Sequence, residues 1–320
     1  MKSTAKTSAS NSVDTTATVG ATLADTAREY LELTKPRVVA LIVFTAVVGM
    51  FLSTPTILPL WPFVWGTLGI ALAAGAAAAF NHILDRRADA QMARTRARPL
   101  PTGTLTQRQA FVFAVALGCL SMLVLVAGVN TLTAVLTLIS IIGYSVVYTL
   151  YLKHATPQNI VIGGAAGAAP PVLGWAAITG EVSADALLLF LIIFTWTPPH
   201  FWALALYRTN EYARVGIPML PVTHGNAFTR LHILLYTILL AAVTVLPFAT
   251  RMSGWLYLVG AMTLNAGFLY YAWKLYRHYS DALARRTFTY SIQYLSLLFG
   301  LLLLDHYGVQ IREALQSALY

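Results

Sequence analysis

The stretch "VVALIVFTAVVGMFLSTPTILPLWPFVWGTLGIALAAGAAAAFNHILDRRAD", residues 38–89, decides the fold class. From Val38 to Phe80 it contains no Asp, Glu, Lys or Arg. The hydrocarbon core of a bilayer is about 30 Å thick and needs about 20 apolar residues per crossing helix. The stretch therefore predicts two transmembrane helices, the second of which ends in polar residues.

The rest of the chain repeats this pattern. Of its 320 residues 58% are hydrophobic and only 10% are charged, which is more apolar surface than a soluble domain of this length can bury. We predict an all-α, polytopic membrane protein with nine transmembrane helices. The expected spans, each bounded by Pro, Gly or charge, are 38–56, 62–83, 109–129, 131–151, 159–178, 185–206, 231–250, 254–273 and 287–304. The fifth is rich in Gly and Ala and carries Pro170 and Pro171, so we expect a kinked helix packed closely among the others.

Orientation follows from the basic residues, because cytoplasmic loops of membrane proteins keep an excess of Lys and Arg. With the N-terminus inside, all 21 Lys and Arg residues except Arg251 and Arg312 fall in inside segments. The sequence therefore predicts an inside N-terminus and an outside C-terminus. The short neutral tail favours a bacterial cytoplasmic membrane, with the C-terminus periplasmic, over a mitochondrial one. Because the basic residues are spread over short loops and a tail, the net charge of +9 is explained by topology, and we expect membrane lipid around the chain and no nucleic-acid partner.

Two further features complete the organisation. Residues 1–25 are a Ser/Thr/Ala tract without hydrophobic periodicity, which predicts a disordered cytoplasmic tail before a membrane domain over 26–320. The lone Cys119 lies within a span, so no disulfide can form within the chain and a packing role is expected.

Three polar residues at the end of the second span form the strongest candidate site. Asn81, Asp85 and Asp89 stand at i, i+4 and i+8, so they line one face of a continuous helix. Oxygen ligands so spaced suit Mg²⁺, which takes one or two carboxylates and completes its coordination with water and substrate phosphates. The alternative is structural: the two acids pair with Arg86, Arg87 or Arg94 at a solvated helix end.

Further polar groups are expected at the same end of the bundle. Arg94, Arg96 and Arg98 alternate in a loop that Pro99 and Pro101 keep from being helical, and guanidinium groups there suit a diphosphate. The other residues that the predicted topology places on this side are Lys153, His154, Asn159, Arg208 and Glu211.

Aromatic residues near these groups predict an apolar cavity that binds an isoprenoid and stabilises a carbocation. They are Tyr148, Tyr151, Trp196, Phe201 and Trp202. His200 lies within the apolar "TPPHFWAL", and an ionisable residue inside a span suggests a function. It could ligate haem iron or hydrogen-bond a haem propionate, or it could be a neutral histidine bonded to a helix carbonyl.

At these motifs the chain resembles a known family. "NHILDRRAD" resembles the first Asn-x-x-x-Asp-x-x-x-Asp motif of the UbiA-type intramembrane prenyltransferases. "MARTRARPLPTG", "YTLYLKHATPQNIVIGGAAGAAPPVLGWAAITG", "WTPPHFWALALYR" and "GIPMLPV" are similar, in order and separation, to the protohaem IX farnesyltransferases, or haem O synthases, within that superfamily. The resemblance covers residues 81–222. It departs at Arg87 (commonly Asp), at Lys153-His154 (commonly Lys-Arg) and at Glu211 (usually Asp).

The resemblance implies a nine-helix bundle that uses Mg²⁺ to transfer farnesyl from farnesyl diphosphate to a vinyl group of haem B, giving haem O. Asn81, Asp85 and Asp89 would then be the metal-diphosphate residues, and Glu211 a further metal ligand. Arg94, Arg98 and Lys153 are expected to gather the charge of the leaving group. The expected substrate-binding residues are Tyr148, Tyr151, His154, Asn159, Trp196, His200, Trp202, Arg208 and Glu211.

Other functions are less consistent with the sequence. A prenyltransferase for a quinone precursor such as 4-hydroxybenzoate would share the first Asp motif but not "WTPPHFW" and "GIPMLPV". A haem-handling transporter would carry its acids near mid-bilayer rather than at one edge. Association with a downstream haem A synthase or a terminal oxidase is left open by the sequence.

Overall fold

The computed structural model describes residues 23–55 and 57–319, and every regular element in these ranges is a helix. The elements are α1 (Leu23–Leu33), α2 (Pro36–Leu52), α3 (Leu60–Gln91), α4 (Pro99–Thr102), α5 (Gln107–Gly128), α6 (Thr131–Ile142), the π-helix η1 (Gly143–Leu152), α7 (Lys153–Ala155), α8 (Asn159–Ala168), α9 (Pro170–Thr179), α10 (Ala184–Leu206), α11 (Thr209–Arg214), α12 (Leu220–Thr223), α13 (Gly225–Val243), α14 (Leu246–Ala249), α15 (Trp255–Arg277) and α16 (Asp281–Leu319). The predicted all-α membrane architecture is confirmed.

Each of the nine predicted spans falls on a helix. Fewer than nine helices of the described chain, however, are both long enough and apolar enough to count as membrane spans. Within the described ranges seven helices are long and apolar enough to cross a membrane, or eight if α1 and α2, bent by 54° at their junction, are one span. Of the nine predicted spans, the one absent from this count is α15, because its 23 residues include tyrosines and Asn265, which lower its mean hydropathy. The buried Asn265 accepts a hydrogen bond from the Tyr294 hydroxyl at 2.7 Å, so packing against α16 provides for a polar group that lipid would not.

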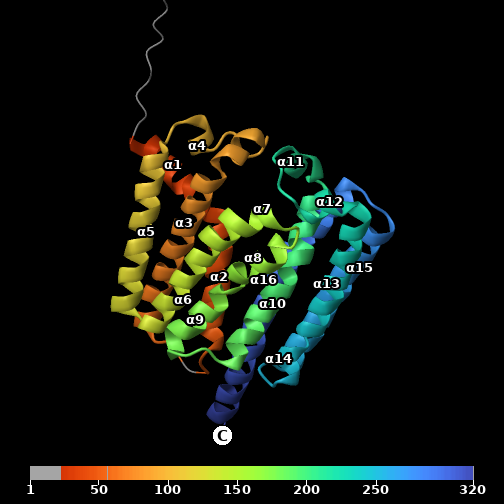
Figure 1. Ribbon diagram of the computed structural model, residues 1–320. Helices are drawn as coiled ribbons and strands as arrows, with labels where there is room; N and C mark the ends of the chain where they lie inside the picture. The colour runs from red at the N-terminus through yellow and green to blue at the C-terminus, as the bar shows by residue number, and fades with distance from the viewer. Residues whose placement is uncertain (1–22, 56, 320) are drawn as a thin grey trace, which may run out of the picture.

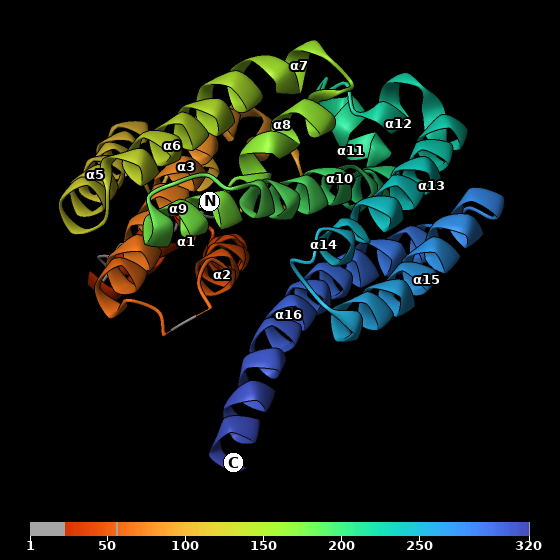
Figure 2. The same cartoon turned by 90° about the horizontal axis from the view of Figure 1, so that it is seen from below.

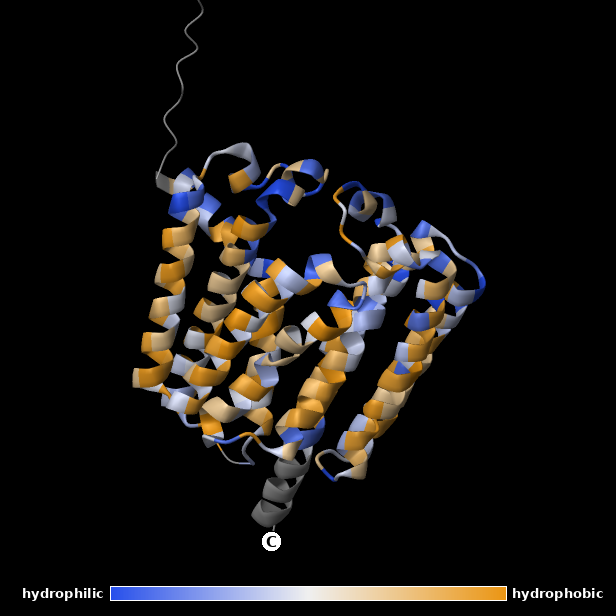
Figure 3. Cartoon of the chain, viewed as in Figure 1, coloured by the Kyte–Doolittle hydropathy of each residue, from blue (hydrophilic) through white to orange (hydrophobic). Residues whose placement is uncertain are grey.

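The long helices run side by side, and most of the short ones lie at one end (Figure 1). α3 packs on α5, α10 on α13 and α8, and α15 on α16. α1, α4, α11 and α12 lie at one end, whereas α14 and the C-terminal end of α16 lie at the other. A view turned by 90° shows the long helices from below (Figure 2). Apolar residues cover the middle of the bundle and hydrophilic ones gather at its ends, chiefly around α4 and α11 (Figure 3).

The predicted kinked fifth span is confirmed as the pair α8 and α9, which meet at Ala169 before Pro170. Its close packing rests on two glycines. A Cβ added at Gly174 would overlap the carbonyl oxygen of Ala46 in α2, and one added at Gly49 would overlap that of Pro171 in α9. Small residues thus let the two backbones touch, as is common where helices pack in a membrane.

The structure differs from the sequence predictions for Cys119 and for the helix over 131–151, and it covers only the last part of the predicted N-terminal tail. Residues 1–22 of the expected tail lie outside the described residues, whereas Leu23–Asp25 are the first turn of α1. Cys119 is a free thiol exposed on α5 rather than packed inside. The expected regular helix over 131–151 widens at Gly143 into η1, where the Thr149 hydroxyl donates to the Tyr144 carbonyl, five residues back, at 2.8 Å.

Candidate functional site

The last three turns of α3 carry a buried polar face. Asn81, Asp85 and Asp89 are 5%, 8% and 5% exposed, and the Asn81 amide donates to an Asp85 carboxylate oxygen at 2.8 Å. The prediction that spacing alone places these three residues on one helix face is confirmed. Because α3 extends to Gln91, these groups lie at the end of the bundle that also carries α4 and α11.

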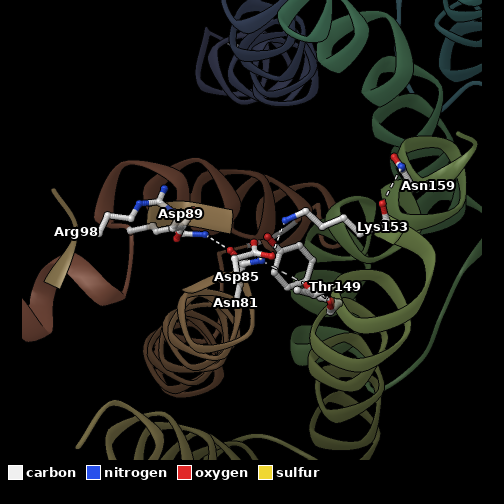
Figure 4. A network of polar contacts seen from close by, with 9 residues as sticks. Asn81, Asp85, Asp89, Arg98, Thr149, Lys153 and Asn159 are labelled. Carbon is white, nitrogen blue, oxygen red and sulfur yellow. Dashed lines mark hydrogen bonds and ion pairs between the residues drawn. The ribbon is translucent and has the colours of Figure 1, made fainter. Parts of the chain in front are cut away.

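Both acids are paired with cations from distant parts of the chain (Figure 4). The Lys153 ammonium lies 2.6 Å from a carboxylate oxygen of Asp85, and the Arg98 guanidinium lies 2.7 Å from one of Asp89. The alternative pairing with neighbouring arginines is therefore wrong. Arg86 instead donates to the side chain of Gln107 at 2.6 Å. Arg87 and Arg94 are exposed.

Lys35 is a site residue that sequence analysis missed. It lies between α1 and α2 in a left-handed backbone conformation, with φ of 51°. Its ammonium donates to the side-chain oxygen of Asn81, 46 residues later. Burial, and next the neighbouring Arg98 charge, lower the pKa of Lys35 to about 7, although Asp85 and Asp89 act in the opposite direction. The cation is therefore held in a poorly hydrated place beside the two acids.

The charges of this cluster do not cancel. When Lys35 is protonated, it supplies together with Arg98 and Lys153 three positive groups against the two carboxylates of Asp85 and Asp89. Uncompensated charge is costly to keep away from water, so the arrangement favours a bound anion. A multiply charged phosphate group is the ligand that several Lys and Arg side chains bind best.

The donor set also fits a magnesium ion. Within the described chain no group of three or more His, Cys, Asp or Glu side chains gathers closely enough to form a complete protein cage. Two carboxylates and an amide oxygen on one helix face are nevertheless what Mg²⁺ uses when water and phosphate oxygens fill its remaining positions. Asp85 and Asp89 could therefore hold the metal only together with a phosphate-bearing ligand.

The π-helix brings the opposite side of the cluster into place. Thr149, buried in η1, lies 3.4 Å from the Asn81 amide, and Lys153 follows directly after η1 at the start of α7. The fully buried Asn159 donates to the Lys153 carbonyl at 3.4 Å, which fixes the turn that carries this lysine. Asn159 thus supports Lys153 from behind, whereas His154 on α7 is exposed.

A cavity of about 330 Å³ adjoins the charged cluster, and Lys35 lines both. Aliphatic residues of α2 and α3 form much of its wall, and residues of α6, η1, α8, α9, α10 and α16 complete it. Of the aromatic residues predicted to line a cavity, Trp196 and Phe201 lie in this wall, and His200 lies there too. The sequence analysis missed Tyr144, which lines the cavity from η1.

The other predicted aromatic residues lie elsewhere. Tyr151 is 68% exposed, because the wide turn of η1 carries it to the outer surface. Trp202 is fully buried, with its ring edge-on to Tyr236 of α13 at 5.3 Å. Tyr148 stacks on Tyr144 at 5.6 Å and so supports the cavity wall from the second layer.

His200 is held firmly in the cavity wall. Its Nδ1 lies 2.7 Å from the hydroxyl of Ser291, and its ring stacks between Trp196 at 4.1 Å and Phe288 at 4.6 Å. The partner of Nδ1 is thus a serine hydroxyl on α16, not the helix carbonyl that was the alternative.

The second predicted acidic group is separate from the first. Glu211 on α11 pairs with Arg208 at 3.1 Å, and both are partly exposed. The neighbouring Tyr212 is buried, which raises its pKa, although the charges of Arg94 and Arg208 oppose that shift. Arg94 therefore lies close enough to α11 to act electrostatically there. α4 and α11 occupy the same end of the bundle on different sides (Figure 1).

Comparison with known proteins places these features in context. Residues 42–298 match the model of the UbiA prenyltransferase family. The chain is 64% identical over 280 residues to the protoheme IX farnesyltransferase of Nitrosospira multiformis, covering 88% of this chain and 94% of that one. It is 66% identical over 281 residues to the protein of the same name from Thiobacillus denitrificans, with the same coverage.

Solved structures share the fold at much lower identity. The structure of digeranylgeranylglyceryl phosphate synthase aligns with a TM-score of 0.74 at 16% identity, covering 88% of this chain and 98% of that one. A UbiA homolog from Archaeoglobus fulgidus bound to DMAPP and Mg²⁺ aligns with a TM-score of 0.62 at 19% identity, covering 86% and 99%.

Proposed function

Because the chain belongs to the UbiA prenyltransferase family, we propose that its charged cluster and cavity carry out a prenyl transfer from an allylic diphosphate. The acceptor is haem B and the donor is farnesyl diphosphate, as the names of the 60–66% identical relatives support. The product is haem O, in which a farnesyl chain and a hydroxyl have been added across one vinyl group. The observation that carries the proposal is the buried cluster of two acids and three cations directly beside an apolar cavity.

The leaving group is the diphosphate, and the chain's cations stabilise the charge that it gains. As the carbon–oxygen bond breaks, Lys35, Arg98 and Lys153 surround the developing negative charge without needing to reorganise. Asp85 and Asp89, with Asn81 beside them, would hold Mg²⁺. When bound, this ion would add Lewis-acid stabilisation of the phosphate oxygens. In this role the two acids also keep the cations in place between turnovers.

The cavity is proposed to hold the farnesyl cation that remains when the diphosphate leaves. Its aliphatic walls, together with Trp196 and Phe201, keep water from the farnesyl cation until a haem vinyl group attacks. Aromatic faces stabilise a nearby cation through their quadrupoles. A cavity of about 330 Å³ is small for both substrates together, so the haem ring is expected at its open side.

We further infer the orientation in the bacterial inner membrane. The end with the charged cluster faces the cytoplasm, since the arginine-rich segment around α4 lies there and such segments are kept inside. The C-terminal end of α16 then faces the periplasm. Glu211, paired with Arg208 across from the first acids, is proposed as a further ligand for the metal-diphosphate group, which would have to displace that pairing.

The test replaces each acid by its amide. In membranes that contain the Asp85→Asn or the Asp89→Asn variant, haem O formation from farnesyl diphosphate and haem B should be abolished while the protein remains inserted. Arg87→Gln, an exposed site on the same helix, serves as the matched control and should keep activity. Substantial turnover by both acid variants would reject the metal-diphosphate role. Offering 4-hydroxybenzoate as acceptor tests the quinone alternative in the same membranes.

A further inference from the structure

The hydrogen bonds around His200 determine which ring nitrogen carries the proton. Ser291 has a single hydroxyl proton, and it donates this proton to the Phe288 carbonyl at 2.6 Å. Toward His200, at 2.7 Å, the same hydroxyl can therefore only accept. The proton of the neutral imidazole must lie on Nδ1, which leaves Nε2 with a free lone pair.

The packing then directs this lone pair. Trp196 and Phe288 cover the two faces of the His200 ring, with interplanar angles of 18° and 26°. The Trp196 indole is itself fixed by donating to the backbone carbonyl of Ser291 at 2.8 Å. With both faces and Nδ1 covered, the edge by which His200 lines the cavity is the edge that carries Nε2.

Other polar groups of the cavity wall are poor proton acceptors. The hydroxyls of Thr45, Ser140 and Thr197 each donate to a carbonyl of their own helix, at 2.9, 2.9 and 2.8 Å, and a hydroxyl is a far weaker base than an imidazole. Lys35 lies at the charged end, where its amino group donates to the side-chain oxygen of Asn81. Thr137 and Tyr144 also lie in the wall, but they too carry only hydroxyl groups. Within the described cavity wall, the His200 imidazole is therefore the group best suited to accept a proton from water.

We propose that His200 is the general base for the water that ends the reaction. This inference rests on the proposed function, because it concerns the cation formed after farnesyl transfer. The vinyl π electrons form the new bond to C1 of the farnesyl group and leave the positive charge on the vinyl carbon next to the porphyrin. The water oxygen bonds to that carbon, one of its O–H bonds breaks, and the proton passes to Nε2. The imidazolium then returns the proton to solvent.

The lone pair also distinguishes this role from the two suggested by sequence. A neutral imidazole whose Nε2 lacks a proton cannot donate a hydrogen bond to a haem propionate from that atom. Ligation of haem iron would use the same lone pair and so is an alternative that the experiment must separate. Without a base, the cation is expected to lose a proton instead, giving a farnesylated haem that lacks one water.

The experiment uses the full chain in detergent with farnesyl diphosphate and haem B, and it measures the ratio of haem O to its dehydrated counterpart by mass. His200→Gln should lower this ratio at least about tenfold, since a positioned base contributes roughly 10²- to 10⁴-fold. Ser291→Ala, which frees the tautomer, should lower it less. Phe190→Leu, at an aromatic residue of α10 that stacks on Phe194 and is not in the cavity wall, is the control and should leave the ratio unchanged.

An unchanged ratio in both His200→Gln and Ser291→Ala would overturn the proposal, whatever their rates. Haem bound through a histidine ligand absorbs at a different wavelength from free haem, so the spectrum of bound haem tests iron ligation. If His200→Gln loses this spectral shift but keeps the wild-type ratio of products, His200 is an iron ligand and the proposal is overturned. If His200→Gln does not accumulate, the Ser291→Ala ratio decides alone. A wild-type chain that makes no farnesylated haem of either kind would instead refute the proposed function itself.

Discussion

Replacement of Lys35 by methionine tests whether its ammonium acts on the diphosphate. The substitution keeps a long unbranched side chain in the cavity wall but removes the charge that bonds to Asn81. The cluster of Lys35, Arg98 and Lys153 against Asp85 and Asp89 then falls from one excess positive charge to none. The variant therefore changes the electrostatics of the site with little change in its shape.

The size of the effect follows from the chemistry of the lost contact. A hydrogen bond to a charged group contributes roughly 1.5–3 kcal/mol. At about 1.4 kcal/mol per factor of ten, this corresponds to a loss of about 10- to 150-fold in kcat/KM. Because the leaving diphosphate gains charge as the bond breaks, the loss should appear in kcat as well as in KM.

The assay measures initial rates of haem O formation against farnesyl diphosphate concentration in detergent. Arg37→Met is the matched control, since Arg37 is an exposed cation two residues away. It should change kcat/KM by less than about threefold, or about 0.6 kcal/mol. If Lys35→Met stays within that same margin, the ammonium does not act on the diphosphate and the reasoning from charge imbalance is refuted.

Three further results are expected. Gly174→Ala should destabilise the protein by about 1–3 kcal/mol in thermal unfolding in detergent, because the added methyl group meets the Ala46 carbonyl. Gly300→Ala is the control and should not destabilise it, since the methyl group there meets open space. Equal stability of the two variants would contradict the close contact between α2 and α9. Removal of divalent metal with a chelator should abolish haem O formation and Mg²⁺ should restore it, so activity that survives chelation would exclude a metal role for Asp85 and Asp89. Glu211→Gln should lower kcat/KM at least about tenfold if Glu211 contacts the metal-diphosphate group. Loss of its partly exposed ion pair with Arg208 alone would change the free energy by only about 0–1 kcal/mol. Glu181→Gln, at an exposed site between α9 and α10, is the control.

The sequence predicted those features that depend on local periodicity. The positions of the long helices follow from uninterrupted apolar runs, and the shared face of Asn81, Asp85 and Asp89 follows from the geometry of one helix. Lys153 and Arg98 were expected near the acids because topology places their loops on the same side. Their particular pairings, Lys153 with Asp85 and Arg98 with Asp89, required the structure.

The features that were missed depend on irregular backbone. Lys35 contacts Asn81 only because the chain bends by 54° between α1 and α2, and nothing in the pattern of hydrophobic residues marks that bend. Tyr144 lines the cavity and Tyr151 faces outward because η1 is a π-helix, whereas a regular helix was assumed over 131–151. A helix widened in this way rotates the side chains that follow it, so face assignments from a 3.6-residue period fail there.

The surplus of positive charge beside Asp85 and Asp89 has a consequence for turnover. The groups that stabilise a departing diphosphate will also retain the free pyrophosphate ion once the farnesyl chain has gone. Pyrophosphate should therefore act as an inhibitor competitive with the prenyl donor. In the cell, enzymes that hydrolyse pyrophosphate would relieve this inhibition.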